Sequence, residues 1–390
     1  MPAYFFFMLL GLSEPLKFGS NLPTTSPDNA VNQVQCILYE MGTPFKLHTL
    51  PWLRARREVK LHRLDGYFTT HLTPEMKAYG KITSPVFLEK WYWFTHPDSV
   101  NKPEEKIHYG AVRGSYQANW LKSQNIQVQV EVNSIEEIIK ILHHQRVDRI
   151  LLDLDDFEHV TSRLEIDQSA YSKEFFRYVP LGLFASNSLI KRFPNFMSQF
   201  DDNLATCSQT PFSLSKSEKD HVLGFIYNQA KALAAQASLT EQTLISNSLP
   251  LSEDELIKAD KQWQTEVKNE QAKLGKLMLD KALSKKLNDW QSQFNGSVTE
   301  VILTDNQGKN VAISKLTSDY WQGDEDKFNK VFTLIDDYYF DNVEYDASTH
   351  HFQVQLSIPV FNEHYNHIGV LIIGIDVEKV LRLNASFTPI

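Results

Sequence analysis

The residues that could ligate a metal or act as nucleophiles do not converge in this sequence. The histidines at 143–144 and at 350–351 are adjacent pairs whose side chains diverge, so neither pair has the spacing of a zinc site. Asp336 and Asp337 are adjacent as well. No glycine-rich phosphate loop, nucleophile elbow or cysteine–histidine pairing stands out. We therefore expect a binding protein that is not an enzyme and that uses no cofactor.

Length and charge bound the architecture. At 390 residues the chain is too long for one ordinary core, so we expect two or three domains. The formal net charge of −9 argues against nucleic-acid binding, which needs a concentrated basic surface. Two cysteines occur, Cys36 and Cys207. They could pair in an oxidising compartment, but we expect two reduced, buried thiols.

The first thirteen residues contain a short apolar run. It has about the length of the apolar region of a signal peptide, and it is too short to span a bilayer. Gly11 and Ser13 would suit cleavage before Glu14, although no Lys or Arg precedes the run. A buried first strand is the alternative. We expect residues 1–13 to be the remnant of a signal peptide and the mature protein to be periplasmic and soluble.

Strands and helices alternate along the first half of the chain. Apolar residues at 31, 34, 37 and 38 recur at helical spacing, whereas residues 45–50 alternate like a strand. Such alternation predicts α/β lobes with parallel sheets. The expected strands lie at residues 16–20, 45–50, 66–69, 107–111, 126–132 and 149–153, and the expected helices at 28–41, 54–62 and 134–144.

Several segments of this half resemble type II periplasmic solute-binding proteins of the amino-acid-receptor kind. Residues 66–77 with 82–87 look like the ligand loop of lobe one, and Val-Arg-Gly-Ser at 112–115 resembles the anion loop of lobe two. Residues 180–184 look like the return across the hinge. The resemblance implies a bilobal α/β domain over residues 14–246, with lobe two at about 98–180, that closes on a ligand.

The same resemblance implies ligand contacts from loops at strand ends. Ser115 at a helix N-terminus could hold an anion, Trp52 could stack on the ligand, and Asp153 could pair with an ammonium group. Trp52 could equally be a packing residue, and Asp153 part of a solvated acidic strand end. The candidates are Asn21, Trp52, Thr69, His71, Arg113, Gly114, Ser115 and Asp153.

Two positions, Met76 and His71, depart from the family pattern. Amino-acid-binding members usually have an arginine, which clamps the ligand carboxylate, where this chain has Met76, so Met76 reads as a core residue. Arg113 could supply the missing charge or point to solvent, and His71 replaces a small hydroxyl residue. An ordinary α-amino acid is therefore a poorer expectation, and the ligand stays open among amino-acid-like molecules, amines and carboxylates.

Residues 247–390 have a different pattern. Apolar residues at heptad-like spacing predict one charged helix over residues 252–294, which could form a homodimer seam, act as a signal strut, or pack along its own sheet. Alternation at residues 300–304, 310–314, 352–360 and 368–376 predicts an antiparallel sheet.

Three stretches of this part, at 304–314, 318–328 and 368–376, resemble the PDC or Cache extracellular sensor fold. The resemblance implies an α+β domain with a long N-terminal helix, an antiparallel sheet, and a pocket between the sheet and the segment over it. Tyr320, Trp321, Asp324 and Glu325 are the implied pocket residues. A tryptophan beside carboxylates suits a cationic ligand. The alternative is that Trp321 caps the core and the carboxylates hold the loop.

Together these features predict a bacterial periplasmic sensory protein that binds a small solute. It would signal by contact to a membrane receptor, kinase or cyclase, because the chain has no predicted span or output domain of its own. The alternatives are a solute receptor of an ABC transporter and an interaction or assembly protein that binds no ligand.

Overall fold

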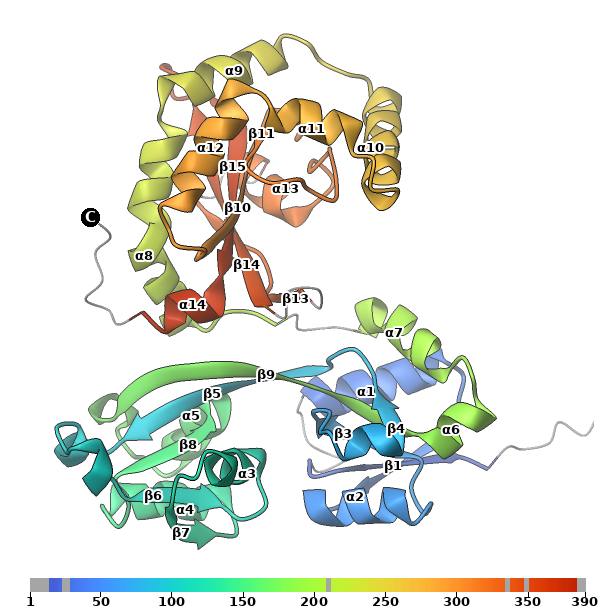
Figure 1. Cartoon of the computed structure of the whole chain (residues 1–390), viewed down its shortest axis with the longest axis vertical. Helices are drawn as coiled ribbons and strands as arrows, with labels where there is room; N and C mark the ends of the chain where they lie inside the picture. The colour runs from blue at the N-terminus through green and yellow to red at the C-terminus, as the bar shows by residue number, and fades with distance from the viewer. Residues whose placement is uncertain (1–13, 23–28, 208–211, 334–336, 347–350, 384–390) are drawn as a thin grey trace, which may run out of the picture. The chain divides into compact units, whose positions relative to one another are not determined.

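The computed structural model describes residues 14–22, 29–207, 212–333, 337–346 and 351–383. The chain divides into two compact units, unit 1 (Met1–Thr210) and unit 2 (Pro211–Ile390), which Figure 1 shows. The division falls earlier than the predicted 246/247, because the helices over residues 216–247 pack on the sheet of unit 2. The expected signal peptide at residues 1–13 lies outside the described residues. Within the described stretches, no helix is long and apolar enough to cross a bilayer.

Unit 1 is a bilobal α/β unit with a mixed sheet in the order β2-β1-β3-β9-β5-β8-β6-β7, and β4 pairs with β9. β1 pairs in parallel with β2 and β3, and β6 pairs in parallel with β7 and β8. The long strand β9 serves both lobes, since it pairs with β3 in the first and with β5 in the second (Figure 1). The strands are β1 (Leu16–Ser20), β2 (Phe45–Thr49), β3 (Gly66–Thr70), β4 (Gly80–Ile82), β5 (Phe87–Thr95), β6 (Tyr109–Val112), β7 (Val128–Val132), β8 (Arg149–Asp153) and β9 (Ser172–Ser186).

The helices of unit 1 begin at side chains that cap them. Ser115, Ser134 and Asp153 each accept a hydrogen bond from a backbone N–H in the first turn of the following helix. These caps fix where α3, α4 and α5 start, at the carboxyl ends of β6, β7 and β8. The helices are α1 (Asn29–Glu40), α2 (Trp52–Lys60), α3 (Tyr116–Ser123), α4 (Ile135–His143), α5 (Leu154–Arg163), α6 (Asn187–Arg192) and α7 (Phe196–Cys207), with short 3₁₀ turns at Met76–Ala78, Pro97–Ser99, Glu104–Lys106 and Gln168–Ala170.

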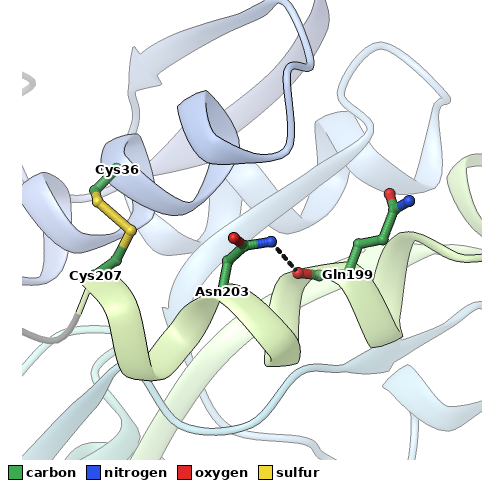
Figure 2. The surroundings of a disulfide bond; sticks show 4 residues. All are labelled: Cys36, Gln199, Asn203 and Cys207. Atoms are coloured by element: carbon green, nitrogen blue, oxygen red, sulfur yellow. Dashed lines mark hydrogen bonds between the residues drawn. A yellow bond between two sulfur atoms is a disulfide. The ribbon is translucent and has the colours of Figure 1, made fainter.

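A disulfide joins Cys36 of α1 to Cys207 of α7, with their Cα atoms 5.7 Å apart. The expectation of two reduced thiols is therefore wrong. It fails because the chain returns from 171 residues away and packs α7 against α1, which sequence spacing does not reveal. Figure 2 shows the bond at the end of α7, beyond Asn203, whose Nδ2 donates to the Gln199 carbonyl at 2.8 Å.

Unit 2 is built on an antiparallel sheet in the order β11-β10-β15-β14-β12, and β13 pairs with β14. Ile302 and Ile372 face each other in register and belong to the core under α10, α11 and α13. On the other face, a Cβ at Gly369 would meet Thr243 of α9 at 3.0 Å, so helices cover both faces. The strands are β10 (Val298–Thr304), β11 (Asn310–Ile313), β12 (Tyr339–Phe340), β13 (Glu344–Asp346), β14 (His351–Phe361) and β15 (His367–Asp376).

The single helix predicted over residues 252–294 is wrong, because this stretch forms three helices. The chain turns between the first two, where Glu270 and Ala272 both have positive φ angles, of 57° and 38°. The turn lets Trp263 and Met278 enter the same core. The predicted homodimer seam would need one continuous helix over residues 252–294, and the structure has three shorter helices there. The helices of unit 2 are α8 (Lys216–Ala234), α9 (Ala237–Asn247), α10 (Glu253–Lys268), α11 (Lys273–Leu279), α12 (Ala282–Ser292), α13 (Asp326–Phe332) and α14 (Val377–Leu381).

Candidate functional site

A cavity of about 600 Å³ lies between the two lobes of unit 1. The first lobe contributes the ends of β1 and β3 and the start of α2. The second lobe contributes β6, β8 and the first turns of α3, α4 and α5, and the shared strands β5 and β9 form the rest of the wall. Five of the eight residues predicted for this cleft line it: Asn21, Trp52, Thr69, Ser115 and Asp153.

On the first-lobe wall, Thr69 donates a hydrogen bond to Asn21 Oδ1 at 2.7 Å. Thr69 has a φ of 58°, and a β-branched residue in this left-handed region is an outlier. Such a conformation costs on the order of 1–3 kcal/mol, and it is found where a fold must hold a ligand contact in place. Trp52, the first residue of α2, is half-buried at the same wall. Thr69 thus keeps an unfavourable backbone conformation while its hydroxyl bonds Asn21 at the cavity wall.

On the second-lobe wall, Ser115 is buried and caps α3, since its Oγ accepts from the Ala118 N–H at 3.0 Å. Gly114 does not line the cavity but provides the turn before the helix, with a φ of 75°. A Cβ at Gly114 would lie 3.2 Å from Leu53 Cδ1, which adds to the backbone reason for glycine here. The hydroxyl of Ser115 therefore sits at the cavity wall in an orientation fixed by the helix start.

The inner wall of the cavity is acidic. Asp153 is buried, and its carboxylate accepts from the N–H groups of Lys90, Asp155 and Asp156 at 2.7–3.1 Å. Burial raises the pKa of Asp153 well above its usual range, and the neighbouring Glu89, Asp156 and Asp155 raise it further. Asp153 therefore works as a helix cap within an acidic wall, and a ligand would share its carboxylate with three backbone donors.

Glu89 on β5 is a second carboxyl at this wall, and its side chain is half-buried. Its Oε2 accepts from Trp91 Nε1 at 2.6 Å and lies 3.4 Å from Gln117 Nε2. Burial raises the pKa of Glu89 to about 7; the hydrogen bond from Trp91 opposes the rise, and the charge of Asp156 adds to it. Strong perturbation of a carboxyl inside a cleft is typical of functional sites.

His71 does not line the cavity but joins the lobes behind it. Its imidazole lies 3.9 Å from the Tyr116 ring, centroid to centroid, and the Arg56 guanidinium lies 4.7 Å from the centroid of the same ring. The Tyr116 and Thr70 hydroxyls share a hydrogen bond. Burial lowers the pKa of His71 to about 4, and the charges of Arg56 and Arg177 lower it further, so the imidazole is neutral near pH 7. Tyr116 of lobe two thus contacts three residues of lobe one.

The other departures from the expected pattern lie outside the cavity wall. Met76 is buried in the first lobe, where Tyr67 Oη lies 3.2 Å from its sulfur, which confirms its place in the core. Arg113 is largely exposed and reaches Asn133 at 3.3 Å and Glu131 at 3.7 Å. Arg113 therefore does not replace the missing arginine in this cleft.

The four residues predicted for a pocket in unit 2 contact different parts of that unit. The Tyr320 ring packs on Trp263, and Trp321 Nε1 donates to the Gln307 carbonyl at 2.7 Å. Glu325 pairs with Lys327 at 2.9 Å, and Asp324 is exposed. Tyr320, Trp321, Asp324 and Glu325 line none of the four main cavities of the described chain.

Unit 2 contains a larger cavity elsewhere, of about 780 Å³. It lies among α8, α9 and the β14–β15 hairpin, with Tyr227, Lys231, Phe361 and Tyr365 in its wall. No residue predicted from the sequence contributes to it. Among the described residues, no group of three or more His, Cys, Asp or Glu side chains could hold a metal ion.

Sequence reasoning did not place several polar and acidic residues in the cleft. Glu89, Gln117 and His159 all line the cavity, as do Asp155 and Asp156. A usable signal was present for Glu89, an acidic residue inside the apolar run Phe-Leu-Glu-Lys-Trp-Tyr-Trp-Phe. Gln117 is the second residue of α3 and His159 lies one turn into α5, and only the direction of each helix brings them to the cavity.

No protein-family model and no curated protein matches the chain. Solved structures similar to it include a histidine kinase sensor domain with similarity to periplasmic binding proteins, at 11% identity over 50% of this chain and 90% of that chain, with a TM-score of 0.43. The GluR0 ligand-binding core from Nostoc punctiforme in complex with L-glutamate matches at 15% identity over 50% and 93%, with a TM-score of 0.42. An ABC uptake transporter substrate-binding protein from Streptococcus pneumoniae with bound histidine matches at 11% identity over 50% and 87%, with a TM-score of 0.42.

Proposed function

We propose that this chain is a periplasmic sensory protein that binds a small solute in the cleft of unit 1. The observation that carries the proposal is the cavity itself, whose wall is built from both lobes and from the two strands that join them. A ligand held there contacts both lobes at once and therefore favours the arrangement in which they are close. Binding would thus increase the fraction of molecules in which the two lobes are close together.

We further propose that the chain signals by direct contact with a membrane receptor, kinase or cyclase. Unit 2 supports a sensory role over simple delivery, because a receptor that only delivers solute needs no domain beyond the two lobes. We infer that unit 2 is a PDC or Cache-type module, on the basis of its antiparallel sheet with helices on both faces and the local resemblance of its strands. Its helical start is α8, which packs on the sheet over residues 216–234.

The disulfide supports the proposed compartment. Structural disulfides persist in oxidising environments such as the periplasm and are rare in reducing ones. The Cys36–Cys207 bond links two helices that pack against each other, and Cys207 is buried, so the bond belongs to the core of the first lobe. We therefore propose that the protein works outside the cytoplasm.

A thermal-shift screen of the full chain against amino acids, amines, carboxylates and sugars tests the proposal. A ligand that binds the folded state alone raises the melting temperature by mass action. We expect at least one hit, and we expect Asn21→Ala to abolish its shift, because Asn21 lines the cavity and holds Thr69. Asn203→Ala is the matched control, since that side chain bonds only within α7 among the described residues. A hit that survives Asn21→Ala would refute the assignment to this cleft.

A second candidate function is an interaction module whose cleft stays without a ligand. Two observations favour it: the Asp153 carboxylate already accepts three backbone donors, and Tyr116 joins the lobes through protein contacts alone. The screen separates the two candidates, because this alternative predicts no shift from any compound class.

A further inference from the structure

We propose that the unit 1 cavity takes a small organic cation, an amine or a guanidine with an apolar body, rather than an amino acid or a carboxylate. This inference rests on the proposed function of the cleft and names its ligand class. It comes from the complete wall of the cavity: its charged side chains, the helix ends that meet there, and its apolar lining.

The ionisable side chains of the wall are four carboxyls and one histidine. Four carboxyls line the cavity, Glu89, Asp153, Asp155 and Asp156, and the residues that line it include no Lys or Arg. Interactions between charges are much stronger in such a cavity than in water, because its walls have a low dielectric constant. A carboxylate on the ligand would meet four acidic side chains there, whereas an ammonium or guanidinium group would meet hydrogen-bond acceptors.

Glu89 is the carboxyl best placed to contact a ligand. Both of its hydrogen bonds, from Trp91 and Gln117, involve Oε2, and among the described residues no donor reaches Oε1. A cation in the cavity would supply the missing donor to Oε1 and would also favour the ionised form of the group. Asp153, by contrast, already accepts three backbone hydrogen bonds, so it has less capacity left for a ligand donor.

Four helices, α2, α3, α4 and α5, begin at the wall, and their N-termini are the main argument for an anion. The helix dipole and the free N–H groups favour negative charge there. Three of these helix starts already have a side-chain acceptor, because Ser115 caps α3, Ser134 caps α4, and Asp153 accepts from the N–H groups in the first turn of α5. The start of α2 has no side-chain cap. At α5 the Asp153 carboxyl therefore takes the position that an anionic ligand would occupy.

The rest of the wall is suited to an apolar ligand body. Leu22, Trp52 and Phe87 come from the first lobe and the joining strand, and Ile135, Leu152 and Leu181 complete the lining. An aromatic face can hold a cation directly as well as an apolar chain. The predicted ligand thus combines one or two positive charges with a short aliphatic or aromatic body.

Isothermal titration calorimetry on the full chain tests the inference with named probes. The cationic probes are putrescine, agmatine and tyramine, and the comparison probes are succinate and L-glutamate. We expect at least one cation to bind and neither comparison probe to bind. Glu89→Gln should weaken the cation at least roughly tenfold, since it removes one partner of a buried charged pair. Glu158→Gln is the matched control on α5, because Glu158 pairs with Lys173 and does not line the cavity.

Each outcome is decisive. Binding of succinate or L-glutamate without the cations would overturn the inference and leave the ligand-binding function standing. Binding of no probe, together with no hit in the broader screen, would overturn both. Equal cation affinity in wild type and Glu89→Gln would also overturn the inference. If Glu89→Gln does not fold by circular dichroism, Asp156→Asn replaces it, with the same expected loss.

Discussion

The Tyr116 ring of the second lobe lies 3.9 Å from the His71 imidazole of the first, centroid to centroid, and the Tyr116 hydroxyl is hydrogen-bonded to Thr70. Tyr116, which directly follows the helix cap Ser115, therefore contacts the opposite lobe directly, and this contact needs no ligand. This contact gives the closed arrangement a stabilisation of its own, to which a ligand in the neighbouring cavity would add.

Tyr116→Phe removes the hydroxyl and leaves the ring. A hydrogen bond of this kind contributes about 1 kcal/mol net, so the ratio of open to closed molecules should rise about fivefold. Single-molecule fluorescence between labels on α2 and α4 measures that ratio. Tyr171→Phe is the control, because Tyr171 bonds His143 within the second lobe. An unchanged ratio would show that the Tyr116 contact does not hold the lobes.

Loss of the disulfide should destabilise unit 1. The Cys36–Cys207 bond closes a loop across a sequence separation of 171 residues, and native disulfides of this kind contribute about 2–4 kcal/mol. We expect the Cys36→Ser/Cys207→Ser variant to unfold at lower urea concentration. Hydrogen exchange should place the loss of protection in α1 and α7, with unit 2 unchanged. Equal midpoints for the oxidised protein and the variant would contradict this prediction.

Unit 2 depends on a buried ion pair. Asp305 and Lys309 pair at 3.1 Å with both side chains almost fully buried, and Ser246 donates to the same carboxylate at 2.7 Å. Removing one partner of a buried pair typically costs about 3–5 kcal/mol. We expect Asp305→Ala to lower the urea midpoint strongly and to expose the β10–β11 hairpin to hydrogen exchange. Asp289→Ala serves as the exposed control, and an equal effect of both variants would argue against this role.

The acidic wall predicts a pH dependence with a definite sign. The pKa of Glu89 is raised to about 7 in the fold, above its ordinary value, so folding favours the protonated carboxyl. Its contribution to stability is present at pH values below the ordinary pKa and is lost as pH rises through 7. Asp153 shifts in the same direction, and Asp155, Asp156 and His159 share the wall.

Melting curves from pH 5 to 8 measure this effect. The wild type should lose more stability over that range than Glu89→Gln, whose side chain does not titrate. The affinity for a cationic ligand should rise over the same range, because ionised Glu89 is the form that pairs with it. Parallel stability curves for the two proteins would contradict the raised pKa of Glu89.

Much of the first unit could be predicted because its information is local. The alternation at residues 16–20 and 149–153 gave β1 and β8 with their observed bounds, and the glycine–serine pair before α3 marked a real helix cap. The disulfide, the charge of the cleft and the Tyr116 contact could not be predicted in this way. Each depends on which segments the fold brings together from far apart in the chain.

The errors in the second unit have a similar origin. Nothing in the local sequence marks the turn at Ala272, which has neither a glycine nor a proline beside it, and the turn forms because Trp263 and Met278 share one core. The domain boundary predicted after residue 246 falls instead in a segment tied to the sheet, since Asn247 donates to the Ile368 carbonyl at 2.9 Å. Tertiary contacts decided both points.

The most direct test of the central claim is calorimetric titration of the strongest screening hit into three forms of the full chain. We predict one binding site per chain in the wild type, loss of binding in Trp52→Ala at the cleft, and unchanged binding in Asp324→Ala on unit 2. Binding that survives Trp52→Ala and disappears in Asp324→Ala would place the ligand in unit 2 and contradict a solute site in the cleft of unit 1.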